Sequence, residues 1–173
     1  HDGTRCILII GTHVDDLLWA NLPEADALVE KICELLKMGK REEYEFTFCG
    51  KEFKQNRSTF VTRVTCKSTT EKLNPIKVDG QTKFTKAQLA DESVLGQEVI
   101  EQCMSVAGSM SWIARSCRPS LCVHASFIQQ SQRKPCYDDC RYANDVVELA
   151  RSTSEEGVTF IPGAEWDGLI VVT

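Results

Sequence analysis

The stretch Thr12-His13-Val14-Asp15-Asp16-Leu17-Leu18 places two adjacent carboxylates between two apolar runs. Residues 6–10 predict a buried strand because they are rich in β-branched side chains, and residues 17–20 predict its antiparallel return. Adjacent like charges repel, and apolar strands raise the cost of desolvating them. The pair therefore predicts a site for a divalent cation or, since aspartate is a common turn residue, a solvated surface turn.

The rest of the chain predicts a mixture of helices and strands. Apolar residues at helical spacing follow Pro23 and predict a helix over residues 23–38. Alternating residues over 44–66 predict a small antiparallel unit. The polar segment 68–83 is predicted to be a linker or an exposed loop because Asn-Pro and Asp-Gly pairs interrupt it. Beyond it we expect three helices and two short strands, over residues 98–116, 120–130, 138–151, 158–161 and 169–172.

Composition is that of a soluble globular protein, with 42% hydrophobic and 26% charged residues among 173. The net charge of -5 argues against a dedicated nucleic-acid binder, although charge can be segregated over a surface. No apolar run reaches the roughly 18 residues that span a membrane, so we expect no membrane partner.

Nine cysteines without a Cys-x-x-Cys motif favour reduced structural thiols over disulfides or a metal site. We therefore expect a reducing intracellular compartment, cytoplasmic and/or nuclear.

Several segments follow one another in the order of one known family. Residues 12–18 resemble the Tyr-Val-Asp-Asp-Leu-Leu hairpin of Ty1/copia-type retrotransposon reverse transcriptases. Residues 48–52, Phe-Cys-Gly-Lys-Glu, resemble the Leu-Gly-Ile-Glu segment that begins the primer-grip hairpin of this family. Residues 106–114, followed by Arg118-Pro119-Ser120, resemble its thumb pattern, and residues 135–157 resemble the next helix. The resemblance covers nearly the whole chain.

The resemblance implies an α+β fold, in which a partial polymerase palm with a catalytic β-hairpin and a primer-grip hairpin is followed by a helical thumb. It implies an RNA-directed DNA polymerase from a larger retroelement polyprotein, a nucleotidyltransferase that uses an RNA template and a DNA primer. The implied divisions are a partial palm, a linker, a helical thumb and the start of a connection to a ribonuclease H region, over residues 1–67, 68–97, 98–157 and 158–173.

The resemblance also implies roles for individual residues. Asp15 and Asp16 would be catalytic and would bind Mg²⁺, or Mn²⁺, in a two-metal nucleotidyl transfer. His13 stands where the family has tyrosine, which implies an altered contact with nucleotide or primer. The implied nucleotide or primer contacts are His13, Val14, Cys49, Gly50 and Lys51, and weaker contacts with the nucleic-acid backbone are implied for Lys54 and Arg118.

The family's third metal-binding aspartate lies on a strand that precedes the catalytic hairpin. We therefore expect residues 1–173 to be a fragment that holds magnesium poorly and has no polymerase activity by itself. A rival hypothesis is a catalytically inactive remnant that serves as a structural or interaction subunit with a partner in a host complex. The net negative charge favours the inactive remnant. The intact Asp15 and Asp16 favour descent from a working enzyme. A metal-binding regulatory module is a third hypothesis and rests on the aspartate pair alone.

Overall fold

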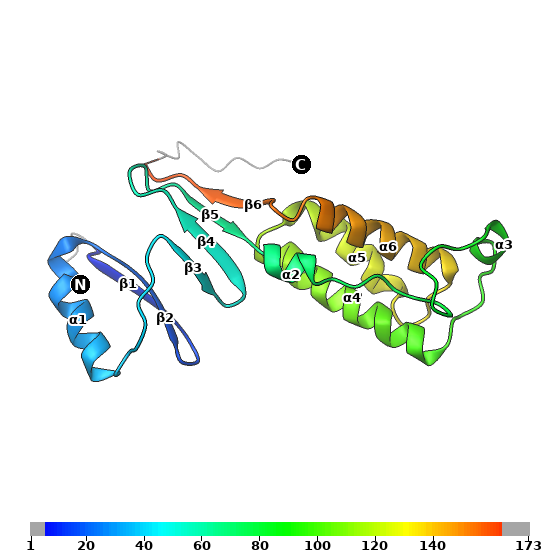
Figure 1. The fold of residues 1–173 in the computed structure, drawn as a ribbon, viewed down its shortest axis with the longest axis horizontal. Helices are drawn as coiled ribbons and strands as arrows, with labels where there is room; N and C mark the ends of the chain where they lie inside the picture. Colours follow the sequence, from blue (N-terminus) through cyan, green and yellow to red (C-terminus); the bar gives the residue numbers. More distant parts are fainter. Residues whose placement is uncertain (1–5, 164–173) are drawn as a thin grey trace.

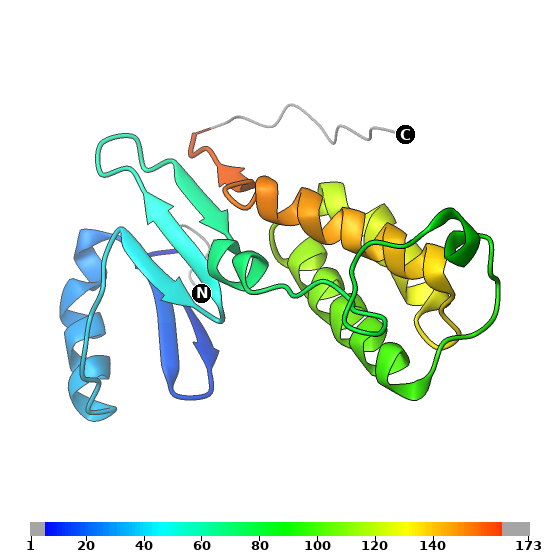
Figure 2. The same cartoon turned by 45° about the vertical axis from the view of Figure 1, so that its right-hand side comes forward.

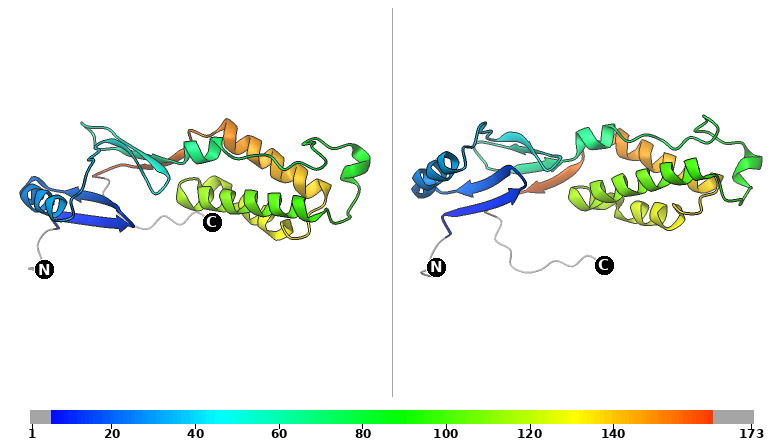
Figure 3. Two further views of the ribbon diagram at one scale, coloured as in Figure 1. Left: turned by 60° about the horizontal axis from the view of Figure 1, so that its bottom comes forward. Right: turned by 90° about the horizontal axis from the view of Figure 1, so that it is seen from below.

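A computed structural model describes residues 6–163, which form an elongated arrangement of three parts (Figure 1). A hairpin with one helix lies at one end, a four-stranded sheet lies in the middle, and a group of helices lies at the other end. Figure 2 and the two views of Figure 3 show the same order from other sides. The mixed α+β class predicted from the sequence is confirmed.

The hairpin pairs β1 (Leu8–His13) with β2 (Asp16–Asn21) in antiparallel register. A short 3₁₀ helix η1 (Pro23–Ala25) and helix α1 (Asp26–Leu35) follow, which confirms the predicted helix. The prediction that the first strand is buried is wrong, because Ile9 is 65% exposed. Within residues 6–163 the hairpin pairs with no further strand, and α1 lies beside it (Figures 1 and 3).

The sheet has the order β3-β4-β5-β6, and every neighbouring pair is antiparallel. The strands β3 (Glu45–Phe48), β4 (Lys51–Gln55) and β5 (Thr62–Thr65) form the small unit that the sequence predicts. The predicted strand near residue 158 is confirmed as β6 (Gly157–Phe160). Its pairing with β5 was not predicted, and it brings the chain back to the sheet after the helices. The strand predicted over 169–172 lies outside the described residues.

The segment after β5 contains α2 (Lys67–Glu71) and α3 (Lys86–Leu89) and is not an exposed loop. Ile76 is completely buried, and its neighbours Leu73 and Val78 are also buried. The side chain of Asn144 accepts a hydrogen bond from the Ile76 amide at 2.7 Å and donates one to the Ile76 carbonyl at 2.9 Å. The prediction of an exposed loop over residues 68–83 is wrong here, because these side chains are buried and a distant amide side chain satisfies the Ile76 backbone.

The helical part contains α4 (Gln97–Ser116), α5 (Cys122–Ser131) and α6 (Tyr137–Ser152), with a 3₁₀ turn η2 (Pro119–Leu121) between the first two. These helices confirm the three predicted from apolar spacing. Their buried faces form the main core together with Val64 and Cys66 at the end of the sheet. The buried residues of α4 and α6 are Val99, Cys103, Val106, Ala107, Met110, Ile113, Ala114, Cys140, Ala143, Val146, Val147 and Ala150.

Candidate functional site

The turn between β1 and β2 consists of Val14 and Asp15, with His13 and Asp16 paired on either side. Val14 has a φ of 50° and its side chain is 88% exposed. A β-branched residue rarely adopts this left-handed conformation, and two-residue hairpin turns normally place glycine, asparagine or aspartate there. Such strain costs about 1–3 kcal/mol and concentrates at functional sites. Five other non-glycine residues among those described also have a positive φ, so this turn is a functional candidate because its strain coincides with the aspartate pair.

Asp15 and Asp16 are both exposed at this turn. The prediction that apolar strands desolvate the pair is therefore wrong, because the hairpin is open to solvent. Within residues 6–163, no group of three or more histidine, cysteine, aspartate or glutamate side chains is arranged to hold a metal ion. The pair alone still offers a fitting donor set, because Mg²⁺ is commonly bound through one or two carboxylates together with the phosphates of a substrate.

The tip of this hairpin contacts the turn between β3 and β4. The His13 ring lies edge-on to the Phe48 ring, with 6.2 Å between centroids and 72° between planes. Phe48 is followed by Cys49 and Gly50, whose φ values of 51° and 73° both lie in the left-handed region. Two successive left-handed residues are typical of a tight hairpin turn. The structure thus brings His13 beside Phe48, the residue that precedes the Cys49-Gly50-Lys51 segment.

The turn at Gly50 also packs against α4. A Cβ atom added at Gly50 would lie 3.2 Å from Cη2 of Trp112, so glycine allows a close approach at this point. Trp112 was not predicted to be a site residue, and it is 37% exposed. One signal could have identified it, because Trp112 lies outside the stripe of buried residues on its helix. The β3–β4 turn therefore joins the aspartate hairpin on one side and the first long helix on the other.

Two lysines near this turn carry positive charge. Lys51 is half-buried and pairs with Phe48 in the hairpin register. Lys54 forms an exposed ion pair with Glu45, with Nζ 2.8 Å from Oε1. Exposed pairs of this kind contribute little stability, so the Lys54 ammonium can exchange its partner for a phosphate at small cost. The predicted contact of Lys54 with a nucleic-acid backbone is compatible with this exposed ion pair.

Arg118 does not fit its predicted contact with a nucleic-acid backbone, because its side chain is 2% exposed. Its Nη1 donates to the Ala150 carbonyl at 2.9 Å, and its Nη2 donates to Thr153 Oγ1 at 2.6 Å and to Glu156 Oε2 at 3.0 Å. These acceptors lie at the carboxyl end of α6 and just beyond it. Carbonyls at a helix end lack partners within the helix, so the guanidinium acts as a cap.

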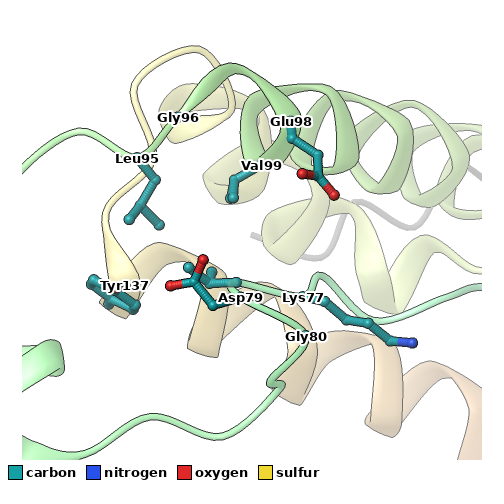
Figure 4. A pocket seen from close by; sticks show the side chains of 9 residues that line it. Lys77, Asp79, Gly80, Leu95, Gly96, Glu98, Val99 and Tyr137 are labelled. Carbon is teal, nitrogen blue, oxygen red and sulfur yellow. The ribbon is translucent and has the colours of Figure 1, made fainter.

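A pocket of about 350 Å³ lies at the other end of the helical part, beside the start of α4 (Figure 4). Asp79 and Glu98 place carboxylates on its walls, and Leu95 and Tyr137 supply apolar surface. This pocket shares no residue with the turn that carries Asp15 and Asp16. It is therefore separate from the candidate site.

No helix within residues 6–163 is long and apolar enough to cross a membrane. Comparison with protein-family models, with curated proteins and with solved structures gives no match. A functional assignment therefore rests on the geometry around Asp15 and Asp16 and on the resemblance of the motifs.

Proposed function

We propose that this chain is part of a Ty1/copia-type reverse transcriptase, with a palm built on the two hairpins and a thumb built on α4, α5 and α6. The observation that carries the proposal is the junction of three elements around one exposed carboxylate pair. The strained turn presents Asp15 and Asp16, His13 joins it to the second hairpin, and Gly50 joins that hairpin to α4. Strain at an exposed acidic turn supports a functional role over a simple surface turn.

The proposed role of this chain's residues follows from their charge and position. Asp15 and Asp16 would hold magnesium in the complete polymerase, and the bound ions would activate a primer hydroxyl and stabilise the leaving pyrophosphate. His13 borders the carboxylates and would orient the primer end against the β3–β4 turn. Lys51 and Lys54 would contact phosphates as positioning residues, because phosphate contacts fix register without reading sequence.

A second candidate function is a structural or interaction subunit that has lost catalysis. The exposed apolar side chains around the aspartate hairpin favour it. Ile9, Leu28 and Leu35 are 65%, 48% and 73% exposed on β1 and α1. Exposed apolar surface of this kind is typical of sites that contact another protein or another part of a larger assembly. Such a subunit would keep this surface covered by a partner and would not depend on the two carboxylates.

The two candidates differ in what a carboxylate-to-amide change does to nucleic-acid binding. We would measure binding of a labelled DNA primer annealed to an RNA template by fluorescence anisotropy, with and without Mg²⁺. Because two carboxylates alone hold Mg²⁺ weakly, the assay uses a high Mg²⁺ concentration. Under that condition the polymerase proposal expects Mg²⁺ to tighten binding by about threefold or more in the wild type, and to have no such effect in the double variant Asp15→Asn, Asp16→Asn. Glu148→Gln is the matched control, since Glu148 is exposed on α6, away from the turn.

Equal binding by the wild type and the double variant, with no effect of Mg²⁺, would overturn the polymerase proposal. Primer extension provides a separate readout. We expect residues 1–173 to give no extension, because no third metal-binding group joins Asp15 and Asp16 within residues 6–163. Template-dependent synthesis that survives in the double variant would exclude these carboxylates as the catalytic pair.

A further inference from the structure

Two buried thiols meet where the four-stranded sheet joins the helices. Cys66 lies between β5 and α2, and Cys117 follows the last residue of α4. Their side chains are 0% and 1% exposed, and their sulfur atoms lie 2.7 Å apart. A second buried pair, Cys103 and Cys140, has its sulfur atoms 3.9 Å apart. The first pair is therefore much closer to covalent contact than the second.

We propose that Cys66 and Cys117 are a disulfide-forming pair whose oxidation locks the four-stranded sheet to α4. A disulfide bond is about 2.05 Å long, so the two sulfur atoms need to approach by less than 1 Å from their observed separation. The pair joins residues 51 positions apart in the sequence. The bond would therefore connect two separate structural elements and would not merely staple neighbouring turns.

The charges around the pair decide which sulfur reacts first. In the neutral pair the Cys117 thiol donates to the Cys66 sulfur. When Cys117 is deprotonated, Cys66 donates instead, and this hydrogen bond followed by the charge of Arg118 lowers the pKa of Cys117 against the effect of burial. The same hydrogen bond and burial raise the pKa of Cys66. Cys117 is therefore the thiol of the pair that loses its proton more readily, and thiolates are the nucleophiles in sulfur oxidation.

Hydrogen peroxide is a sufficient oxidant. The Cys117 thiolate attacks one peroxide oxygen, the O–O bond breaks, and hydroxide leaves, so that a sulfenic acid forms. The Cys66 sulfur then attacks the Cys117 sulfur, the S–S bond forms, and the sulfenic oxygen leaves as water with the Cys66 proton. In total, two thiols lose two electrons and two protons, and one peroxide is reduced to two waters.

The burial of the two thiols determines how fast they oxidise, and the length of chain between them determines how much the bond raises the Tm. Both thiols are shielded, so their oxidation requires local opening and should be slower than that of the exposed Cys122. The cross-link restricts the unfolded chain, and a bond of this span is expected to raise the Tm by about 5–15 °C. Reduction with dithiothreitol should reverse the rise. The wider pair, Cys103 and Cys140, should stay reduced under the same treatment.

The test is peptide mapping of the 173-residue protein after treatment with hydrogen peroxide. Free thiols are blocked with iodoacetamide in denaturant, and the protein is digested with trypsin without reduction. Cleavage places Cys66 in peptide 64–67 and Cys117 in peptide 116–133, because trypsin does not cut before Pro119. Peptide 116–133 also contains Cys122, so the experiment uses Cys122→Ser. The exposed position of Cys122 makes this change safe for the fold.

The expected result is a linked pair of peptides 64–67 and 116–133 that dithiothreitol separates, together with the reversible rise in Tm. Three results would overturn the proposal. These are alkylation of both Cys66 and Cys117 after oxidation, sulfinic acid at Cys117 without a link, and a link from either cysteine to a different partner. Fragmentation spectra of the oxidised wild type locate the bond independently, so the outcome does not depend on the folding of any variant.

Discussion

Replacing Arg118 with alanine should destabilise the fold because the guanidinium holds the end of α6. The buried Ala150 carbonyl would lose its donor, and an unsatisfied buried acceptor costs about 1–3 kcal/mol. The hydrogen bond to Thr153 adds about 1 kcal/mol. The Glu156 carboxylate is 58% exposed, so its pairing contributes at most about 0.5 kcal/mol after screening.

One contribution opposes this loss. The Arg118 Nε atom is buried without a partner among the described residues, so removing the side chain relieves about 1 kcal/mol of unfavourable desolvation. The expected loss in the free energy of unfolding is about 2–3 kcal/mol. Arg118→Lys should recover only part of it, because an ammonium lacks the planar fork that reaches three acceptors.

Urea unfolding followed by far-UV circular dichroism measures this loss directly. Arg115→Ala is the matched control, because Arg115 is an exposed arginine in the last turn of α4. An exposed substitution of this kind should change stability by no more than about 0.5 kcal/mol. If Arg118→Ala costs no more than Arg115→Ala, the guanidinium does not cap α6 as described. Loss of duplex binding by Arg118→Ala with full stability would restore the predicted nucleic-acid contact.

Three further substitutions test other parts of the structure. Asn144→Ala should cost about 1–3 kcal/mol and speed hydrogen exchange at Ile76, whose backbone it holds; unchanged exchange would contradict this contact. Gly157→Ala should cost about 2 kcal/mol or more in urea unfolding, because a Cβ would collide with the Val64 carbonyl, and a neutral result would show that β6 does not pair as described. Val14→Gly should raise the free energy of unfolding by about 0.5–1 kcal/mol by relieving a left-handed valine, and a loss would show that this turn is not strained.

Local patterns predicted the longer helices well, and missed the short helices α2 and α3. Apolar residues at helical spacing predicted α4 and α6 within one residue at each end, because each helix buries one continuous face. Pro23 correctly marked the start of the first helical stretch. These features depend on neighbours along the chain, so periodicity is sufficient to find them.

Features that depend on distant partners were not predictable in the same way. Ile76 lies in a largely polar segment of the sequence, and Asn144, which satisfies its buried backbone, is 68 positions away. The exposure of Ile9 depends on whether other elements pack over the hairpin, and the local sequence pattern does not indicate this packing. The cap that Arg118 forms on α6 was not predicted, because its acceptors on and after α6 lie more than 30 positions downstream.

The sequence singled out the aspartate turn, whereas the contacts around it were not predicted. The sequence predicted the turn carrying Asp15 and Asp16, because two adjacent aspartates between apolar runs are distinctive. The contacts of His13 with Phe48 and of Gly50 with Trp112 depend on the placement of three separate elements. Such placement follows from packing between elements, which a single sequence does not display.

The return of the chain to the sheet at β6 has a mechanical consequence. The chain leaves the sheet through β5 and comes back through its neighbour β6, so two covalent strands connect the sheet to the helices (Figure 1). A body tethered at one point can swivel in any direction, whereas a body tethered at two adjacent points can rotate freely only about the line that joins them. The helical part should therefore resist twisting against the sheet, because twisting would require β5 and β6 to separate and would disturb the core that Val64 and Cys66 share with the helices.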